Sequence, residues 1–145
     1  GNSLVFEPET ISMASISFPC GHEMDAMLMV SGSNTRLLPT SVNGAFISFS
    51  GPETMAYRLL TKNHKPHEIV SSVFLCIAES LIKAICYIRN KTGLNKILFL
   101  GGVSSSQFIR NYINGIFEKE GVTILWGDPR YCVDNAVGTA LLAAK

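Results

Sequence analysis

The chain has 145 residues, of which 47% are apolar and 16% are charged, and its formal net charge is +1. This composition excludes an intrinsically disordered chain, and the length is that of one domain. The near-neutral charge gives no general electrostatic attraction to nucleic acid. The apolar excess predicts an exposed apolar face that contacts a second domain, a protein partner or a second copy of the chain.

The sequence favours a cytoplasmic protein with no membrane-spanning segment. The most apolar long segment, residues 68–88, contains Glu79 and Lys83, and no uninterrupted apolar stretch reaches the roughly 18–20 residues that a span requires. We expect free thiols in a reducing compartment rather than a disulfide framework. The four cysteines form no C-x-x-C pair: Cys20, Cys76, Cys86 and Cys132.

The first half of the chain predicts short elements separated by turns. Apolar residues at helical spacing predict a helix over residues 22–30, followed by a loop over 31–44. Alternating Phe and Ser residues predict a strand over 45–50. A Gly-Pro turn then leads into a short helix over 53–60.

The second half predicts alternating helices and strands. Pro66 occupies a favoured first helical position, and Gly93 marks the end of a long amphipathic helix. A buried strand over 96–100, a helix over 104–118, a strand over 122–125 and a helix over 133–144 follow. This order predicts an α/β layer with neighbouring parallel strands.

Gly101 and Gly102 follow the strand over 96–100 directly and precede a helix. Two interpretations remain open at this point. The glycines make a tight turn and nothing more, or they let a phosphate or sugar approach the backbone. In the second case the three serines 104–106 cap the helix and offer its amides to an anion. The pattern is neither G-x-G-x-x-G nor a Walker loop.

Asp134 opens the last predicted helix. One interpretation is a carboxylate that interacts favourably with the helix dipole. The other is a hard oxygen ligand for a divalent metal ion. The residues alone do not decide between them.

Four segments in order resemble one family. They are F-P-C-G-H-E-M-D (18–25), I-S-F-S-G-P-E-T (47–54), I-L-F-L-G-G-V-S-S-S (97–106) and C-V-D-N (132–135). They are similar to the motifs Y-P-G-G-P-x-(I/L)-(D/E), F-S-F-S-G-L-K-T, G-G-V-(A/S)-A-N and C-T-D-N of the TsaD-like family. That family is also called Gcp or O-sialoglycoprotein endopeptidase-like.

The resemblance implies one lobe of an actin/Hsp70/sugar-kinase-like (ribonuclease H-like) α/β fold, with a mixed sheet and flanking helices. Residues 1–145 would be the C-terminal lobe, and the N-terminal lobe would be absent. Family members bind adenine nucleotide between the lobes and transfer threonylcarbamoyl from an adenylate to a tRNA adenosine. The implied partners are the missing lobe, tRNA, a TsaB-like protein and, through the apolar face, a second copy.

The resemblance also implies roles for single residues. Gly21 and Asp25 match nucleotide- or substrate-contacting positions, and Gly101 and Gly102 match the loop against the nucleotide. Ser106 stands at the position of the family's nucleotide-contacting Asn and is a further candidate for nucleotide or substrate binding. Other departures from the family motifs are Pro52-Glu53, where the family has Leu-Lys, and His22, where it has Pro. Asp134 matches a ligand of the family's divalent metal, iron or zinc, whose H-x-x-x-H ligand pair does not occur in this chain.

Three functions therefore compete. The first is a nucleotide-facing transferase lobe that is inactive alone, binds nucleotide weakly or not at all, and holds no metal. The second is a non-catalytic paralogue that acts as a protein-interaction or regulatory module. The third, with least support, is a metallopeptidase-like hydrolase, because the chain supplies neither a nucleophile–base pair nor a complete zinc site.

Overall fold

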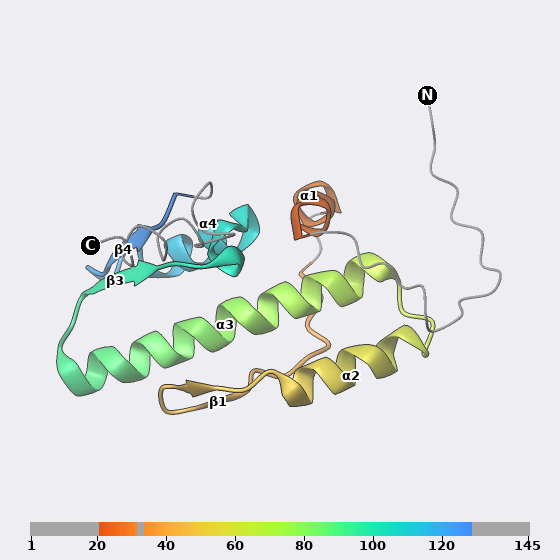
Figure 1. Cartoon of the computed structure of the whole chain (residues 1–145), viewed down its shortest axis with the longest axis horizontal. Helices are drawn as coiled ribbons and strands as arrows, with labels where there is room; N and C mark the ends of the chain where they lie inside the picture. Colours follow the sequence, from red (N-terminus) through yellow and green to blue (C-terminus); the bar gives the residue numbers. More distant parts are fainter. Residues whose placement is uncertain (1–20, 32–33, 129–145) are drawn as a thin grey trace, which may run out of the picture.

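In the computed structural model, residues 21–31 and 34–128 are described, and they form a small mixed α/β domain. The 27-residue helix α3 (Pro66–Thr92) runs through the middle of the molecule, with the other elements along its two sides (Figure 1). The predicted ends of this helix are confirmed. Pro66 lies in its first turn, and Gly93 ends it with a left-handed φ of 72°.

The first side of α3 carries a small hairpin and helix α2 (Ser50–Leu60). Strands β1 (Val42–Asn43) and β2 (Phe46–Ile47) pair antiparallel. The strand predicted over 45–50 is wrong beyond its first residues, because α2 already begins at Ser50. Its first turn accommodates Pro52, since the amides there have no intrahelical partner to lose.

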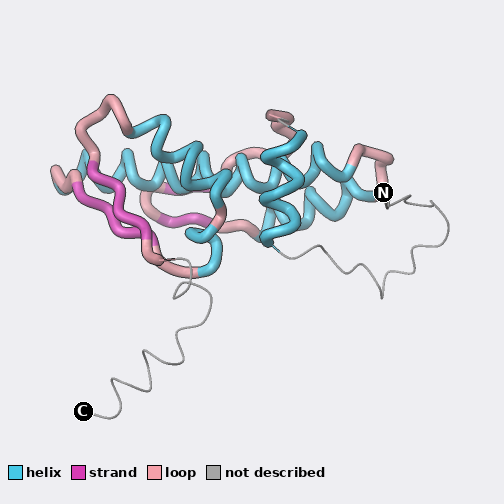
Figure 2. The backbone as a smooth tube through the Cα atoms, turned by 90° about the horizontal axis from the view of Figure 1, so that it is seen from above, coloured by secondary structure: helices cyan, strands magenta, loops and turns pink. Residues whose placement is uncertain are grey.

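The second side carries helix α1 (Gly21–Ser31), helix α4 (Gln107–Phe117) and a pair of parallel strands. Strand β3 (Lys96–Phe99) pairs in register with β4 (Thr123–Trp126), which confirms the predicted neighbouring parallel strands. The two strand pairs belong to separate sheets within the described residues (Figure 2).

Two predictions on this side are wrong in part. The helix predicted over 104–118 is split into a 3₁₀ turn, η1 (Gly102–Ser105), and α4, because Ser106 between them has an extended backbone. The strand over 96–100 was expected to be buried, yet Leu98 is 58% exposed. Only one face of the β3–β4 pair packs on the described core. The helix predicted over 133–144 lies outside the described residues.

The core of the second side is apolar. Phe74, Ala78 and Ile85 of α3 contact Ile109 and its neighbours on α4. Leu28 of α1 is 2% exposed and joins the same cluster. Burial of these side chains supplies most of the favourable free energy that holds α1 and α4 on α3.

The first side is attached differently, through a ladder of small polar side chains on α3. Ser72 Oγ accepts a hydrogen bond from Leu37 N at 3.0 Å and lies 2.7 Å from the carbonyl oxygen of Thr35. One turn on, Cys76 Sγ donates to the carbonyl of Pro39 at 3.2 Å. A further turn on, Ser80 Oγ accepts from Ser41 N at 3.4 Å. Spacing by four places all three on one stripe of the helix.

Among the described helices, α3 is the one that is long and apolar enough to cross a membrane by length and composition. The central helix of a globular domain meets the same criteria. In this molecule, 56% of its most apolar window is buried against other elements. The two packed sides described above therefore account for much of its apolar surface.

Candidate functional site

The Gly-Gly loop lies where β3 ends. Gly101 has φ 98° and ψ 167°, a conformation that is essentially restricted to glycine. Gly101 and Gly102 are both exposed, and no atom would lie within 4 Å of a Cβ added to either. The backbone here is open to close approach from outside, and the turn itself requires a glycine only at Gly101.

The amides that follow this loop are already engaged. Ser104 N donates to the carbonyl of Gly101 at 3.0 Å, and Ser106 N donates to the carbonyl of Val103 at 3.2 Å. The expectation that the amides of the three serines face an anion is therefore wrong for Ser104 and Ser106. The 3₁₀ turn uses them for its own i→i+3 hydrogen bonds.

An anion does bind the start of α4, and it is the carboxylate of Asp25 from α1. Asp25 accepts hydrogen bonds from the Ser106 hydroxyl at 2.7 Å, Gln107 N at 2.7 Å and Phe108 N at 3.0 Å. Ser106 Oγ in turn accepts from Ile109 N at 3.2 Å, so Ser106 is the N-cap of α4. Three of these four hydrogen bonds satisfy amides at the start of α4 that have no acceptor within the helix. The negative charge of Asp25 also lies at the positive end of the helix dipole.

The structure thus brings together two of the residues singled out from the sequence, Asp25 and Ser106. The loop of Gly101 and Gly102 lies just before Ser106 in the chain. Gly21 is the first residue of the same helix α1 that carries Asp25. The nucleotide- or substrate-binding roles of these residues stay predictions. Asp134, Cys20 and Cys132 lie outside the described residues.

Sequence reasoning missed Arg110, which links η1, the turn after β3, to Gly127, the residue after β4. Its Nε donates to the carbonyl of Ser104 at 2.6 Å, and its Nη2 donates to the carbonyl of Gly127 at 2.7 Å. The guanidinium carbon lies 5.3 Å from the centre of the Trp126 ring, which stacks on Phe99 at 4.5 Å. The available signal was a single basic residue within the otherwise uncharged helix that follows the Gly-Gly loop.

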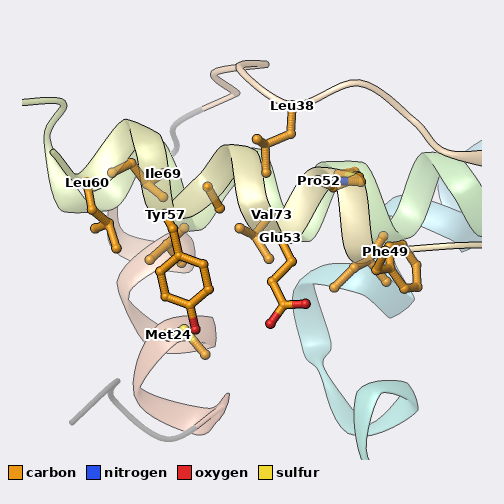
Figure 3. A pocket seen from close by; sticks show the side chains of 13 residues that line it. Met24, Leu38, Phe49, Pro52, Glu53, Tyr57, Leu60, Ile69 and Val73 are labelled. Atoms are coloured by element: carbon orange, nitrogen blue, oxygen red, sulfur yellow. The ribbon is translucent and has the colours of Figure 1, made fainter. Parts of the chain in front are cut away.

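A separate apolar groove of about 250 Å³ lies between α1, α2 and α3 (Figure 3). Figure 3 shows Tyr57 reaching toward Met24 of α1, with the Glu53 carboxylate beside it. Cys76 also lines the groove, and its burial raises the pKa of the thiol, with a smaller rise from nearby Glu79 and an opposing effect of the Ser80 hydrogen bond. Its lining suits an apolar group rather than a nucleotide phosphate.

The described residues contain no group of three or more His, Cys, Asp and Glu side chains placed to hold a metal ion. The two described cysteines, Cys76 and Cys86, are free thiols. The metal-binding role of Asp134 therefore stays a prediction.

Comparison with known proteins decides the family. The family model described as tRNA N6-adenosine threonylcarbamoyltransferase, TsaD, matches residues 5–141. The chain belongs to the TsaD family. This membership confirms the resemblance of the four motifs and implies the actin/Hsp70/sugar-kinase-like fold, with which the mixed α/β architecture agrees.

Relatives with this name share about a quarter to a third of their aligned residues with the chain. The tRNA N6-adenosine threonylcarbamoyltransferase of Vesicomyosocius okutanii is 27% identical over 92% of this chain, and that of Kosmotoga olearia is 29% identical over 88%. The chain spans 40% of the length of each. A probable bifunctional tRNA threonylcarbamoyladenosine biosynthesis protein of Thermoplasma volcanium is 32% identical over 84% of the chain, which spans 23% of that relative.

Proposed function

We propose that this chain is the nucleotide-facing C-terminal lobe of a TsaD-like protein that transfers threonylcarbamoyl to a tRNA adenosine. One observation carries the proposal: the exposed Gly101–Gly102 backbone at the carboxyl end of a parallel strand. In α/β sheets, ligands bind outside the carboxyl ends of the strands. Family membership and the chain's share of 40% of two relatives support a lobe of a longer protein.

The carboxylate of Asp25 supports one orientation of a nucleotide at this edge of the sheet. A phosphate placed at the start of α4 would lie against a negative charge that already holds the amides of Gln107 and Phe108. Hydroxyl and amine donors, in contrast, would find an acceptor in Asp25. We infer that the sugar or base lies beside Asp25 and that the phosphates extend along the open backbone of Gly101 and Gly102.

The proposed nucleotide contacts do not depend on the family's divalent metal. The described residues supply no cluster that fits a metal ion. Asp134 would contribute one carboxylate, and an iron or zinc site requires further ligands from the other lobe. We propose that this ligand set is complete only in the two-lobed protein, in the cytoplasm, where tRNA and a TsaB-like protein are its partners.

Titration of the ¹⁵N-labelled chain with AMP and ATP, monitored by NMR, tests the proposal. Half of a two-lobed cleft offers few convergent contacts, so we expect millimolar affinity, with shifts centred on the amides of Gly101, Gly102 and Asp25. A Gly102→Val variant should lose these shifts, whereas Gly115→Ala, an exposed glycine with the same open surroundings on α4, should keep them. Shifts centred elsewhere would contradict the proposal. So would the absence of shifts at 10 mM nucleotide, a concentration roughly tenfold above the expected dissociation constant.

A second candidate function has its own observation. The α4 amides are occupied from within the chain by Asp25, and an apolar groove lies between α1, α2 and α3. Both features fit a non-catalytic module that binds a protein partner. An H-x-x-x-H motif upstream in the same gene would favour the transferase, and its absence would favour the module. The metallopeptidase-like alternative gains no support from the described residues.

A further inference from the structure

We propose that Arg110 is a positioning residue that joins the two loops leaving the carboxyl ends of β3 and β4, so that they respond together to a ligand. The coupling itself is a property of the described residues. Only the identity of the ligand, an adenine nucleotide, rests on the proposed function.

The first argument is the reach of one side chain. Phe99 and Trp126 are register partners and the last residues of the two strands. The chain leaves β3 through η1, whose Ser104 carbonyl accepts from Arg110 Nε at 2.6 Å. It leaves β4 at Gly127, whose carbonyl accepts from Arg110 Nη2 at 2.7 Å. A single guanidinium therefore bonds both exits, although they are far apart in the sequence.

The second argument is the geometry of the guanidinium. Its plane fixes the angle between the two N–H donors, so the distance between the two carbonyls is fixed with it. The Trp126 ring on which it lies is itself held, because it stacks on Phe99 and its Nε1 donates to Asn114 Oδ1 at 3.0 Å. A lysine at this position would present a compact ammonium on a flexible stem and would not reproduce the fork.

The third argument is that Arg110 has no acidic partner among the described residues. None of the ion pairs among residues 21–31 and 34–128 includes it. Within residues 21–31 and 34–128, its hydrogen bonds go to backbone carbonyls alone, and those carbonyls belong to the two loops. Within the part of the chain that the structure describes, the cation therefore fixes backbone positions at the proposed site and pairs with no carboxylate.

Hydrogen exchange on the unliganded chain tests the coupling. Three amides report on the two loops, because each is hydrogen-bonded in the folded chain: Ser104 N, Ser106 N and Gly127 N. In Arg110→Met we expect exchange at all three to accelerate by roughly tenfold or more, the equivalent of losing hydrogen bonds from a charged donor. The amides of Ile113 and Phe117 in the buried part of α4 should be unaffected.

Two variants separate positioning from charge and from general stability. Arg110→Lys keeps the charge but reaches one carbonyl at a time, so we expect one loop to be protected and the other to exchange faster. Arg58→Met removes an exposed arginine of α2 and should change neither loop. Acceleration spread evenly over α4 in Arg110→Met, or unchanged exchange in both loops, would overturn the proposal.

The single tryptophan of the chain provides an optical readout that general destabilisation would not produce. Loss of the guanidinium from the Trp126 ring should alter its emission in the folded Arg110→Met protein, with far-ultraviolet circular dichroism unchanged. Emission identical to the wild type would count against the stacked arrangement.

The same variants separate this proposal from the proposed function. On titration with AMP, the amides of Gly102 and Gly127 should shift together in the wild type, and only Gly102 should shift in Arg110→Met. Independent shifts of the two loops in the wild type would refute the coupling. If AMP shifts neither loop in the wild type, the nucleotide assignment fails, and the exchange experiment alone then decides the role of Arg110.

Discussion

The two sides of α3 are held by different physical means. On the α4 side, buried apolar residues such as Phe74 and Ala78 pack on Ile109 and Ile113. On the other side, the segment 34–41 is attached by hydrogen bonds to Ser72, Cys76 and Ser80, with a smaller apolar cluster beside it. The same helix thus forms an apolar interface on one side and a polar ladder on the other.

The difference shows why α3 has no exposed residue between positions 69 and 82. Ser72 and Ser80 are at most 1% exposed, although serine is usually a surface residue. Each is buried because it satisfies backbone groups of segment 34–41, which is not part of a strand. Small side chains also let that segment lie close to the helix. Apolar periodicity specifies the α4 side, and polar residues spaced by four specify the other.

The largest expected effect is on the apolar side. Ile113→Ala removes a side chain that is 0% exposed and leaves a cavity between α4 and α3. We expect a loss of about 2–5 kcal/mol in the free energy of unfolding, measured by urea denaturation. Ile116→Ala, on the same helix but 43% exposed, should cost about 1 kcal/mol or less. Equal losses in the two variants would show that the α4 side is not the main core.

The next effect concerns the contact between α1 and α4. Asp25→Ala removes the acceptor of three hydrogen bonds at the start of α4, and we expect a loss of about 1–3 kcal/mol. The amides of Gln107 and Phe108 should exchange faster.

Added formate offers a control for the missing carboxylate. At matched ionic strength, it should raise the Tm of Asp25→Ala more than that of the wild type. Glu53→Gln removes the charge of an α2 carboxylate that forms no ion pair with any other described residue, and it should change little. If Asp25→Ala is as stable as the wild type and its exchange rates are unchanged, the Asp25 hydrogen bonds do not hold α1 on α4.

The sequence was sufficient where local signals agree with tertiary packing. Pro66 and Gly93 bracket α3 as expected, and the Gly101–Gly102 turn lies directly after β3. It failed where a short local pattern fits two structures, as at residues 45–50. Alternation at 45–50 predicted a strand, yet Phe49 already accepts a helical hydrogen bond from Glu53 N at 2.8 Å. Short alternating runs leave strand and helix close in free energy.

The candidate site was predictable only in part, because contacts between distant parts of the chain determine its geometry. Motif similarity singled out Asp25 and Ser106, but their hydrogen bond joins residues from distant parts of the chain, and no spacing rule reveals it. Arg110 was missed because its partners are backbone carbonyls, whose positions depend on the fold rather than on side-chain types. The three serines suggested free amides, and the 3₁₀ turn that engages two of them has no clear sequence signature.

A smaller effect is expected from the polar ladder. Ser72→Ala leaves Leu37 N without its acceptor and removes the hydroxyl beside the Thr35 carbonyl. We expect a loss of about 1–2 kcal/mol, with faster exchange at Leu37 and little change in α4. Thr54→Ala removes an exposed hydroxyl that bonds only within its own helix, and it should cost less. A Ser72→Ala protein as stable as the wild type would show that the apolar cluster alone holds this side.

The smallest expected effect is on the pH dependence of the free energy of unfolding, to which Cys76 contributes on the polar side of α3. Burial raises the pKa of the Cys76 thiol above its ordinary value of about 8.5. The neutral thiol suits the folded chain, so its contribution to stability is complete below the ordinary pKa. As the pH rises through and beyond that value, the unfolded chain ionises first, and the contribution is lost up to the raised pKa of the folded state.

Cys76→Ser removes this ionisation and keeps a hydroxyl that can donate to the Pro39 carbonyl. Between pH 7 and pH 10 (a range that spans the ordinary thiol pKa of about 8.5), the free energy of unfolding should fall more steeply for the wild type than for Cys76→Ser. Subtracting the two curves cancels the titration of the other cysteines, which both proteins share. Parallel curves would mean that the thiol ionises as easily in the folded chain as in the unfolded one. In that case water would reach the ladder, and the contrast between the two sides of α3 would be weaker than the hydrogen bonds indicate.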